Sequence, residues 1–575
     1  MDGDMATRHN SRYTVDIPPI DLTTFIFSSG DREQRRRPQF FDADCPARCF
    51  SLDQAEILVK RLAKGLQDLG LGKNDKVLLY SGNSLYFPIL YWGTVAAGCV
   101  FTGCSPSASV TELSYQVKDS DAKLIITSAA GVQTALEAAA QVGIPKGRVF
   151  EFADPLDKRT QSGLRSWADI WATEEESATW TWKRISSAKE ARETTVAINY
   201  SSGTTGTPKG VEISHQNVIA NSLQVIFKRN MVADTPRARE RKARIDLSGE
   251  RWLAPLPMFH AYGQMYYCVT AARMGVKVFI MMQYSIERYL LFLDIYRITF
   301  LTGVPTLMVA LSKHPNATAY NLKAIESVVT GSAPLNPEIG RLVEKTHLRP
   351  GVQVKQGWGL TETTCSATGF AQDDEDDGRS IGWLNPNVSA KIVPVPEHGF
   401  EQSTEIPYTV GEIWIAGPNV MKGYYKRPRE TMETILYDDD GTRWLKTGDV
   451  GYIDKRGCLY IVDRLKELIK VKGLQVAPAE IEQVLLTHPG IADAAVVGEK
   501  RRDGEYPKAF VVRAPGSTVT AKEVQEYIET RLSRHKWLTA GVHFIEVIPR
   551  TPSGKVMRRL LQKSKPDTAK SSAKL

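Results

Sequence analysis

The sequence contains little cysteine, only a small excess of charge and no apolar leader, and each of these features excludes a class of protein. Its seven cysteines, spread over 575 residues without a C-x-x-C pair, argue against a disulfide framework or a structural zinc site and predict a reducing, intracellular compartment. Lys and Arg (73) exceed Asp and Glu (65) by +8, which suits anionic ligands but does not demand nucleic acid. The polar start Met1-Asp-Gly-Asp-Met-Ala lacks a signal-peptide core, so we do not expect secretion.

One stretch is poor in charge and requires a decision about membranes. From Val77 to Glu112 the only charged residue is Glu112 itself, and the stretch includes the apolar run from Leu85 to Gly103. Ser81-Gly-Asn-Ser84 and Pro88 interrupt that run. We therefore predict a buried strand followed by a core helix, and no membrane span.

The order of apolar runs predicts the fold class. A chain of 575 residues exceeds the roughly 250 to 300 at which one core stops growing, so we expect at least two cores. Between Ser51 and Phe370 short apolar runs alternate with helical patterns, which indicates an α/β fold of doubly wound parallel sheets. Beyond Gly411 the pattern changes to short antiparallel strands, a β-barrel-like part, and then to a small α+β domain whose helices begin near Pro478 and at the capping box Thr520 to Glu523.

Two charged segments interrupt these patterns. Asp234 to Arg244 (DTPRARERKAR) is mostly basic, and Asp373 to Asp377 (DDEDD) is acidic. We expect both to be solvated loops rather than binding patches, because charge runs without apolar periodicity are usually solvent-exposed.

The strongest local signal is a loop rich in Ser, Thr and Gly that directly follows the apolar strand TVAINY. It runs from Ser201 to Gly210 as SSGTTGTPKG. Its glycines let backbone N–H groups surround an anion, its hydroxyls add donors and Lys209 adds a positive charge, so we predict a phosphate-binding loop. The loop is not a Walker A motif, because Gly210 and a strand-like VEIS segment follow the lysine. The alternative, a flexible linker, fits poorly between two apolar strands.

At this loop the sequence resembles the adenylate-forming superfamily, which includes acyl-CoA synthetases, 4-coumarate:CoA ligases, firefly luciferases and adenylation domains. The resemblance extends from about Ser51 to Lys565 through several motifs in the same order, and it implies the use of ATP, Mg²⁺ and CoA. It implies that the loop binds nucleotide phosphates through Ser201, Ser202, Gly203, Thr204, Thr205, Gly206, Thr207 and Lys209.

Two further motifs resemble the nucleotide site of that superfamily. The resemblance places Gly331, Ser332 and Ala333 beside the adenine, together with Gln356, Gly357 and Trp358. It gives Thr361 to the α-phosphate and Glu362 to Mg²⁺, which takes carboxylate ligands together with phosphate oxygens. Trp358 replaces the commoner Tyr but keeps a flat face for stacking. The same resemblance gives Asp449 to the ribose hydroxyls and Arg464 to the ribose and phosphate.

The small domain carries the remaining nucleotide groups by the same resemblance. Lys555, in Thr551-Pro-Ser-Gly-Lys555, matches the adenylation lysine, and Lys466 matches the hinge. A cation is needed because a carboxylate about 4 Å from a phosphate costs about 4 kcal/mol per charge pair at an effective dielectric near 20. The resemblance assigns Lys470 and Gln475 to nucleotide binding and thioester formation, and it assigns Lys472 and Gly473 to CoA binding. We therefore predict an N-terminal domain over residues 1–465, a C-terminal lid over 466–565 and a tail over 566–575.

The acyl pocket is expected around His260, which the resemblance places beside the substrate carboxylate. Its walls are expected to be Ala261, Tyr262, Val304, Gly331, Gly357, Cys365 and Ser366. Glycines facing a tyrosine suit a flat aromatic or a medium-chain acyl group. The chain has Thr363-Thr-Cys-Ser-Ala where 4-coumarate ligases commonly have Gly-Pro-Val, which argues against hydroxycinnamates. Cys365 is expected to be a wall and not a nucleophile, because no base accompanies it.

We therefore predict an ATP-dependent acid:CoA ligase, with three alternatives left open. These are an enzyme that loads a carrier protein, a luciferase-like oxygenase and a nucleotide-binding protein without catalysis. The last three residues, Ala573-Lys574-Leu575, resemble the C-terminal Ser-Lys-Leu peroxisomal address, so the import receptor is an expected partner and the peroxisome the expected location.

Overall fold

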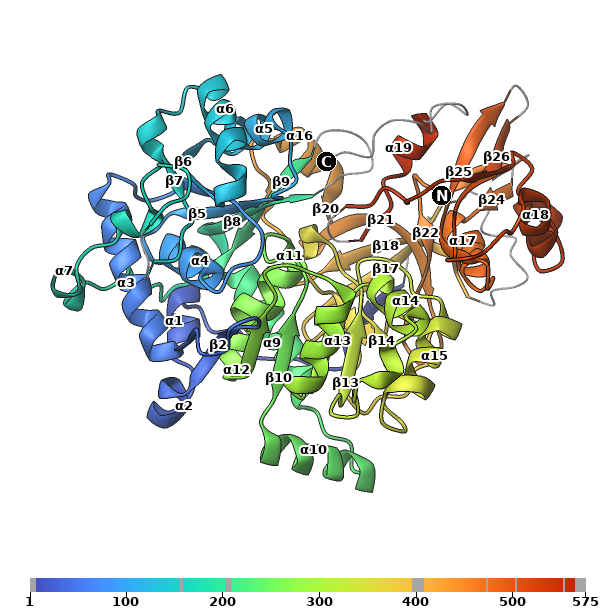
Figure 1. The fold of residues 1–575 in the computed structure, drawn as a ribbon, viewed down its shortest axis with the longest axis horizontal. Helices are drawn as coiled ribbons and strands as arrows, with labels where there is room; N and C mark the ends of the chain where they lie inside the picture. The colour runs from blue at the N-terminus through green and yellow to red at the C-terminus, as the bar shows by residue number, and fades with distance from the viewer. Residues whose placement is uncertain are drawn as a thin grey trace.

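The structure is a computed structural model that describes residues 7–155, 159–201, 208–395, 408–471, 474–501, 504–551 and 554–563. Three sheets form the larger part of the molecule, and a small α+β domain lies beyond them at the red end of the chain (Figure 1). All seven cysteines lie in the described ranges and are free thiols. Among the described residues, no helix has the length and apolarity that a membrane crossing requires.

The first sheet has helices on both faces. Its strands run in the order β19-β9-β8-β5-β4-β6-β7. Every residue from Val77 to Tyr80 in β4 is buried, because Val77 and Leu79 join the main core while Leu78 and Tyr80 join a second cluster. A strand covered on both faces is apolar throughout. The strands are β4 (Lys76–Tyr80), β5 (Val100–Cys104), β6 (Ala122–Thr127), β7 (Val149–Glu151), β8 (Thr195–Ser201), β9 (Lys209–Ser214) and β19 (Gly423–Tyr424).

The helices of this sheet agree with the sequence patterns. Helix α4 (Phe87–Ala96) is entirely buried, as predicted for the charge-poor stretch. It packs with α3 (Leu52–Asp68), while α5 (Val110–Ser120) packs with α6 (Val132–Val142) on the opposite face. The strands from β8 to β7 pair in parallel, as predicted for this part of the chain. One edge differs, because β8 and β9 form an antiparallel pair and β19 continues it antiparallel to β9.

The second sheet carries the strands that lead to the adenine motifs. Its order is β14-β13-β12-β10-β11-β2-β3, and all neighbours are parallel except β2 and β3. Its strands are β2 (Pro38–Asp42), β3 (Cys49–Ser51), β10 (Arg251–Ala254), β11 (Lys277–Ile280), β12 (Phe300–Gly303), β13 (Ser327–Thr330) and β14 (Val354–Gln356). Helices α9 (His215–Asn230), α13 (Ile286–Ile295), α14 (Pro305–Lys313) and α15 (Pro337–His347) connect and cover it.

The prediction of solvated loops was wrong for the basic segment, whereas the acidic segment Asp373 to Asp377 is a loop of half-buried and exposed residues. Pro236–Ser248 forms helix α10, which projects at the lower edge of the molecule (Figure 1). Its Arg241 is buried and pairs with Asp373 of the acidic segment through two hydrogen bonds of 3.0 and 2.9 Å. The sequence patterns gave no sign of this pairing because it joins residues 132 positions apart.

The third sheet and the small domain follow the predicted change of pattern. Six antiparallel strands correspond to the barrel-like part: β1 (Arg8–Asn10), β17 (Ser389–Pro394), β18 (Gly411–Ala416), β20 (Ile435–Tyr437), β21 (Arg443–Ile453) and β22 (Leu459–Arg464). The small domain has its own apolar cluster, which runs from Ile469 to Leu538. It contains β23 (Ile469–Val471), β24 (Leu474–Val476), α17 (Pro478–Leu486), β25 (Ile491–Arg501), β26 (Gly504–Arg513), α18 (Ala521–Glu529), β27 (Val542–Phe544) and α19 (Arg558–Lys563). The boundary at residue 465 stays a prediction.

Candidate active site

Trp358, Asp449 and Arg464 come together where the second and third sheets meet. The Trp358 indole Nε1 donates to Asp449 Oδ2 at 2.8 Å, and Arg464 Nε lies 3.1 Å from Asp449 Oδ1. Asp449 and Arg464 are register partners on β21 and β22, which explains why residues 15 positions apart meet. Asp449 is buried, and its charge is the main cause that raises the pKa of Arg464. The pair is a fixed carboxylate and guanidinium beside an indole.

The expected adenine loop follows β13 and is shaped by Gln356. Gln356 Oε1 accepts a hydrogen bond from the Leu335 backbone N at 2.8 Å, and Nε2 donates to the Gly378 carbonyl at 2.9 Å. Its side chain therefore holds the loop from Gly331 to Leu335, in which Ser332 has a positive φ of 75°. Ser332 is exposed, and Ala333 and Trp358 are half-buried.

The phosphate side is built on the β8–β9 pair. Ser201 and Lys209 are register partners at its end, while the predicted ligands Ser202, Gly203, Thr204, Thr205, Gly206 and Thr207 lie outside the described residues. The Lys209 Nζ lies 4.5 Å from the ring centroid of Tyr424. The Tyr424 hydroxyl in turn donates to Glu362 Oε1 at 3.0 Å. The predicted phosphate lysine and the predicted metal ligand thus share one neighbour.

Thr361 and Glu362 lie in a single 3₁₀ turn, Thr361–Thr363. Thr363 caps this turn through its hydroxyl, which accepts from Leu360 N at 2.8 Å. The Met421 backbone N donates to the Glu362 carbonyl at 2.8 Å, so the turn is fixed from outside as well. Both predicted ligands are half-buried beside the first and second sheets.

The structure brings Lys555 of the small domain to this centre. Burial and the positive charge of Arg464 lower the pKa of Lys555 to about 8, and the carboxylates of Glu467 and Asp449 act in the opposite direction. A Cβ built on the adjacent Gly554 would lie 3.5 Å from Val304, a predicted wall of the acyl pocket. Lys555 therefore approaches the junction between the nucleotide side and the acyl side.

Contacts across the predicted domain boundary hold the small domain in this position. Lys313 Nζ donates to the Ile491 carbonyl at 2.6 Å, and Asn336 Nδ2 donates to the Gln483 carbonyl at 2.7 Å. The Asp463 carboxylate accepts from Ala479 N at 3.2 Å, at the start of α17. Burial raises the pKa of Asp463 to about 7.

The groups assigned to thioester formation lie elsewhere on the small domain. Lys470 and Gln475 are partners in the β23–β24 hairpin, where Lys470 N donates to Glu505 Oε2. Gln475 Oε1 is buried and receives no hydrogen bond from the residues that the structure describes. Ile469 of this hairpin packs on Gly498 of β25. The loop that carries Lys555 is instead bound to Asp493 of β25 through Arg550. Asp493 lies five residues from Gly498, which is roughly 16 Å along the strand.

The hinge candidate Lys466 is exposed in the turn between β22 and β23. Lys472 and Gly473, the predicted CoA-binding residues, lie outside the described residues. In this conformation Lys555, and not Lys470 or Gln475, reaches the nucleotide centre.

Several residues predicted to line the acyl pocket meet around Tyr262, next to His260. His260 caps α11 (Ala261–Gly263) by accepting from Tyr262 N at 3.3 Å, and burial lowers its pKa to about 4, so its ring is neutral at physiological pH. The Tyr262 hydroxyl donates to the Val329 carbonyl at 3.4 Å. A Cβ on Gly331 would lie 3.8 Å from the Tyr262 ring and 3.1 Å from the Gly357 carbonyl, so glycine at position 331 keeps the space between these groups open.

The remaining residues predicted to line the pocket are Cys365 and Ser366, and Tyr266 lies beside them. Cys365 lies near Tyr262 and Tyr266, and burial raises the pKa of its thiol to about 12, which keeps it neutral. The Ser366 hydroxyl donates to the Thr368 carbonyl at 3.1 Å, so it serves the local backbone. Tyr266 lies in a π-helix, Gln264–Thr270, and packs edge-on against Tyr262 with the two ring centroids 5.0 Å apart.

Sequence reasoning missed Tyr266 and Tyr424. Tyr266 stands four residues after Tyr262, a helical spacing that could have pointed to it. Tyr424 is far in sequence from Lys209 and Glu362. The antiparallel pairing of β19 with β9 brings it to Lys209, and the hydrogen bond from Met421 N to the Glu362 carbonyl holds Glu362 beside the same segment.

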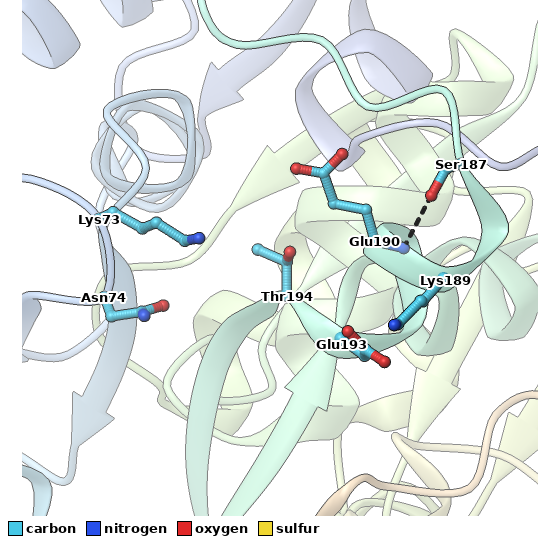
Figure 2. A pocket seen from close by; sticks show the side chains of 7 residues that line it. All are labelled: Lys73, Asn74, Ser187, Lys189, Glu190, Glu193 and Thr194. Atoms are coloured by element: carbon cyan, nitrogen blue, oxygen red, sulfur yellow. Dashed lines mark hydrogen bonds between the residues drawn. The ribbon is translucent and has the colours of Figure 1, made fainter.

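A separate polar pocket of about 280 Å³ lies on the surface between the Lys73–Asn74 turn and α8 (Ala188–Glu193). Figure 2 shows Lys73 and Asn74 on one side and Glu190, Glu193 and Thr194 on the other. Thr194 precedes β8, whereas the predicted phosphate loop follows it, so this pocket lies at the opposite end of the strand from the candidate site.

Comparison with known proteins agrees with this geometry. The sequence model described as AMP-binding enzyme matches residues 32–425, and that of the AMP-binding enzyme C-terminal domain matches residues 480–555. The chain belongs to the AMP-binding enzyme family.

Similar proteins span nearly the whole chain. Phenylacetyl-CoA ligase epaB of Aspergillus niger is 34% identical over 555 residues, covering 96% of this chain and 97% of that protein. A 4-coumarate–CoA ligase-like protein of Oryza sativa subsp. japonica is 34% identical over 534 residues, covering 92% and 89%. ATP-bound MatB from Rhodopseudomonas palustris has a TM-score of 0.77 at 26% identity, covering 96% and 99%. The anthranilate CoA ligase AuaEII, at 19% identity and a TM-score of 0.79 over 95% and 98%, shares the fold.

Proposed function

We propose that this protein is an ATP-dependent acid:CoA ligase that activates an aromatic or medium-chain carboxylic acid. The acid first attacks the α-phosphate of ATP, which forms an acyl-AMP and releases pyrophosphate. The CoA thiol then attacks the acyl carbon, which forms the thioester and releases AMP. The observation that carries the proposal is the convergence of Lys555, Arg464 and Asp449 beside the Val304 and Tyr262 wall.

The class of acid is argued from the pocket. Gly331 lies beside the Tyr262 ring and the Gly357 carbonyl, and Tyr266 and Cys365 extend the wall without a charged group of their own. Such a lining favours a flat, apolar acyl group. A relative that is named a phenylacetyl-CoA ligase supports the aromatic choice.

Mg²⁺ is the metal that the site fits. Among the described residues no group of three or more His, Cys, Asp or Glu could hold a metal ion. A cation at Glu362 would therefore take one carboxylate and complete its shell with phosphate oxygens and water, which is the pattern of Mg²⁺ with nucleotides. Bound there, the ion would neutralise phosphate charge.

The test is a substrate panel with product analysis. The protein, ATP and Mg²⁺ are incubated with CoA and cinnamic, benzoic, phenylacetic or C4 to C18 fatty acids, and AMP, pyrophosphate and acyl-CoA are quantified by chromatography. We expect AMP and an acyl-CoA in equal amounts, with the highest kcat/KM for an aromatic or medium-chain acid. Release of ADP and phosphate would contradict an adenylate mechanism. Acyl-AMP that is never passed to CoA would favour a carrier protein as acceptor, and light from a luciferyl substrate would favour an oxygenase.

We also propose that Ala573-Lys574-Leu575 addresses the protein to peroxisomes through the import receptor. These residues lie outside the described ranges, and the proposal rests on their likeness to the Ser-Lys-Leu signal. A fluorescent protein fused ahead of the intact tail should co-localise with a peroxisomal marker, and deletion of the three residues should abolish this. Diffuse fluorescence of both fusion proteins would remove the proposal.

A further inference from the structure

Tyr424 is a buried residue that no sequence motif pointed to, yet it touches both charged groups of the phosphate side. Strand β19 (Gly423–Tyr424) pairs antiparallel with β9, which places Tyr424 opposite Val211, two residues after Lys209. Its backbone N donates to Thr431 Oγ1 at 2.9 Å, which fixes the strand from its other side. The side chain is only 8% exposed, so it is held in one position.

The hydroxyl of Tyr424 forms a hydrogen bond with Glu362. It donates to Oε1 at 3.0 Å, and Oε2 accepts no hydrogen bond within the described ranges of the chain. A tyrosine hydroxyl is protonated at neutral pH, so it remains a donor. One carboxylate oxygen is thus fixed, while the other is available to a cation.

The ring of Tyr424 contacts the ammonium group of Lys209. The ammonium group lies 4.5 Å from the ring centroid, within the range of a cation–π interaction. In the described parts of the structure Lys209 and Glu362 form no ion pair with each other, and both contact Tyr424. The tyrosine therefore stands between a cation and an anion that would otherwise be free to neutralise each other.

We infer that Tyr424 is a positioning residue that keeps the Lys209 ammonium and the Glu362 carboxylate apart and oriented for a metal-bound triphosphate. The inference rests on the proposed function, because it gives these two groups to phosphate and metal. A direct Lys209–Glu362 ion pair would remove one positive charge from the phosphates and one carboxylate from the metal. Tyr424 prevents this by hydrogen-bonding one partner and stacking with the other.

The neighbouring Tyr425 provides a matched control. Its hydroxyl donates to Asp121 at 2.8 Å and accepts from Lys76 Nζ at 2.9 Å, so it also bonds a carboxylate and meets a lysine, but it touches neither Lys209 nor Glu362. Tyr424→Phe removes only the hydroxyl and keeps the ring. Tyr424→Leu removes both, and Tyr425→Phe removes the equivalent hydroxyl one residue away.

The experiment measures binding of a non-hydrolysable ATP analogue by calorimetry, with Mg²⁺ and with EDTA, in the full chain and in all three variants. A hydrogen bond to a charged group corresponds to roughly a 10-fold loss or more, so Tyr424→Phe should weaken binding by about that factor with Mg²⁺ and little with EDTA. Tyr424→Leu should weaken binding in both conditions, and Tyr425→Phe should match the wild type. Thermal unfolding of each variant identifies any loss of folded protein.

Kinetics of the two half-reactions complete the test. Tyr424→Phe should raise the KM for ATP in adenylate formation and leave the conversion of supplied acyl-AMP to acyl-CoA unchanged. Equal behaviour of Tyr424→Phe and Tyr425→Phe, or equal weakening with Mg²⁺ and with EDTA, would overturn the inference. If the wild type converts no acid, the proposed function fails, yet the binding comparison still decides the role of Tyr424.

Discussion

At the scale of single residues, the site depends on charges that the fold sets. Lys555 lies among Arg464, Asp449 and Glu467, and burial with the Arg464 charge lowers its pKa to about 8. His260 is held neutral because burial lowers its pKa to about 4. Lys555 can thus lose its proton just above neutral pH, whereas His260, beside the predicted acyl pocket, stays neutral in that pH range.

The pH dependence of adenylate formation follows from Lys555. The lysine is charged below pH 8 and neutral above it, so kcat/KM for ATP in adenylate formation should fall as the pH rises through about 8. Stopped-flow pyrophosphate release between pH 6 and 10 measures this. Lys555→Arg, which keeps its charge, should lack the decline in its residual activity, and a wild-type profile that stays flat to pH 10 would contradict the role of Lys555.

We predict that Gly331 sets the width of the acyl pocket. Valine at this position would put a Cβ 3.1 Å from the Gly357 carbonyl and 3.8 Å from the Tyr262 ring, and its methyl groups would fill the remaining slot. We expect Gly331→Val to lower kcat/KM for phenylacetic acid by roughly 10- to 200-fold, the range for steric mismatch in a pocket, and to affect butyric acid much less. Initial rates with both acids decide it; equal losses would show that Gly331 does not line the pocket.

At the scale of elements, the sequence predicted what depends on local pattern. Helix α4 and strand β4 follow from uninterrupted apolar runs, and the capping box at Thr520 and Glu523 starts α18 as expected. Pairings between distant segments could not be predicted. The antiparallel β8–β9 pair, the contact of α10 with Asp373 and the place of Tyr424 each join residues whose local sequence carries no trace of the partner.

The Arg241–Asp373 pair links α10 to the loop after the nucleotide motifs. The side chains are 9% and 14% exposed, and removal of one partner leaves a nearly buried charge. Arg241→Ala should therefore destabilise the fold by about 3 kcal/mol and lower the unfolding temperature by several degrees. Differential scanning calorimetry measures this, with Arg239→Ala as the control, because Arg239 pairs with Asp234 on the exposed face of the same helix. Equal shifts in the two variants would contradict the account.

At the scale of the whole molecule, the small domain faces one requirement that a single position cannot meet. Lys555 reaches the nucleotide centre, while Lys470 and Gln475 lie at the other end of β25. If both sets act on the same acyl-phosphate centre, the domain rotates between the half-reactions. The exposed turn at Lys466 lies between the two parts, and we predict that it is the place of that rotation.

Proline at Lys466 tests the hinge. Proline fixes φ near −65°, which hinders rotation while leaving the present position reachable. Lys466→Pro should therefore slow the conversion of supplied acyl-AMP to acyl-CoA and leave adenylate formation near the wild-type rate. Single-turnover assays of each half-reaction measure this, with Lys466→Ala as the control that removes the side chain alone. Unimpaired thioester formation in Lys466→Pro would place the hinge elsewhere.

The most direct test of the central claim is a single-turnover comparison of both half-reactions in Lys555→Ala. The structure brings this lysine to the nucleotide centre in an adenylate-forming arrangement, and loss of one positioned group that stabilises developing charge typically costs about 10²- to 10³-fold. The account predicts that loss in the formation of acyl-AMP from ATP and acid, and a near wild-type rate for supplied acyl-AMP with CoA. An equal loss in both half-reactions would contradict it.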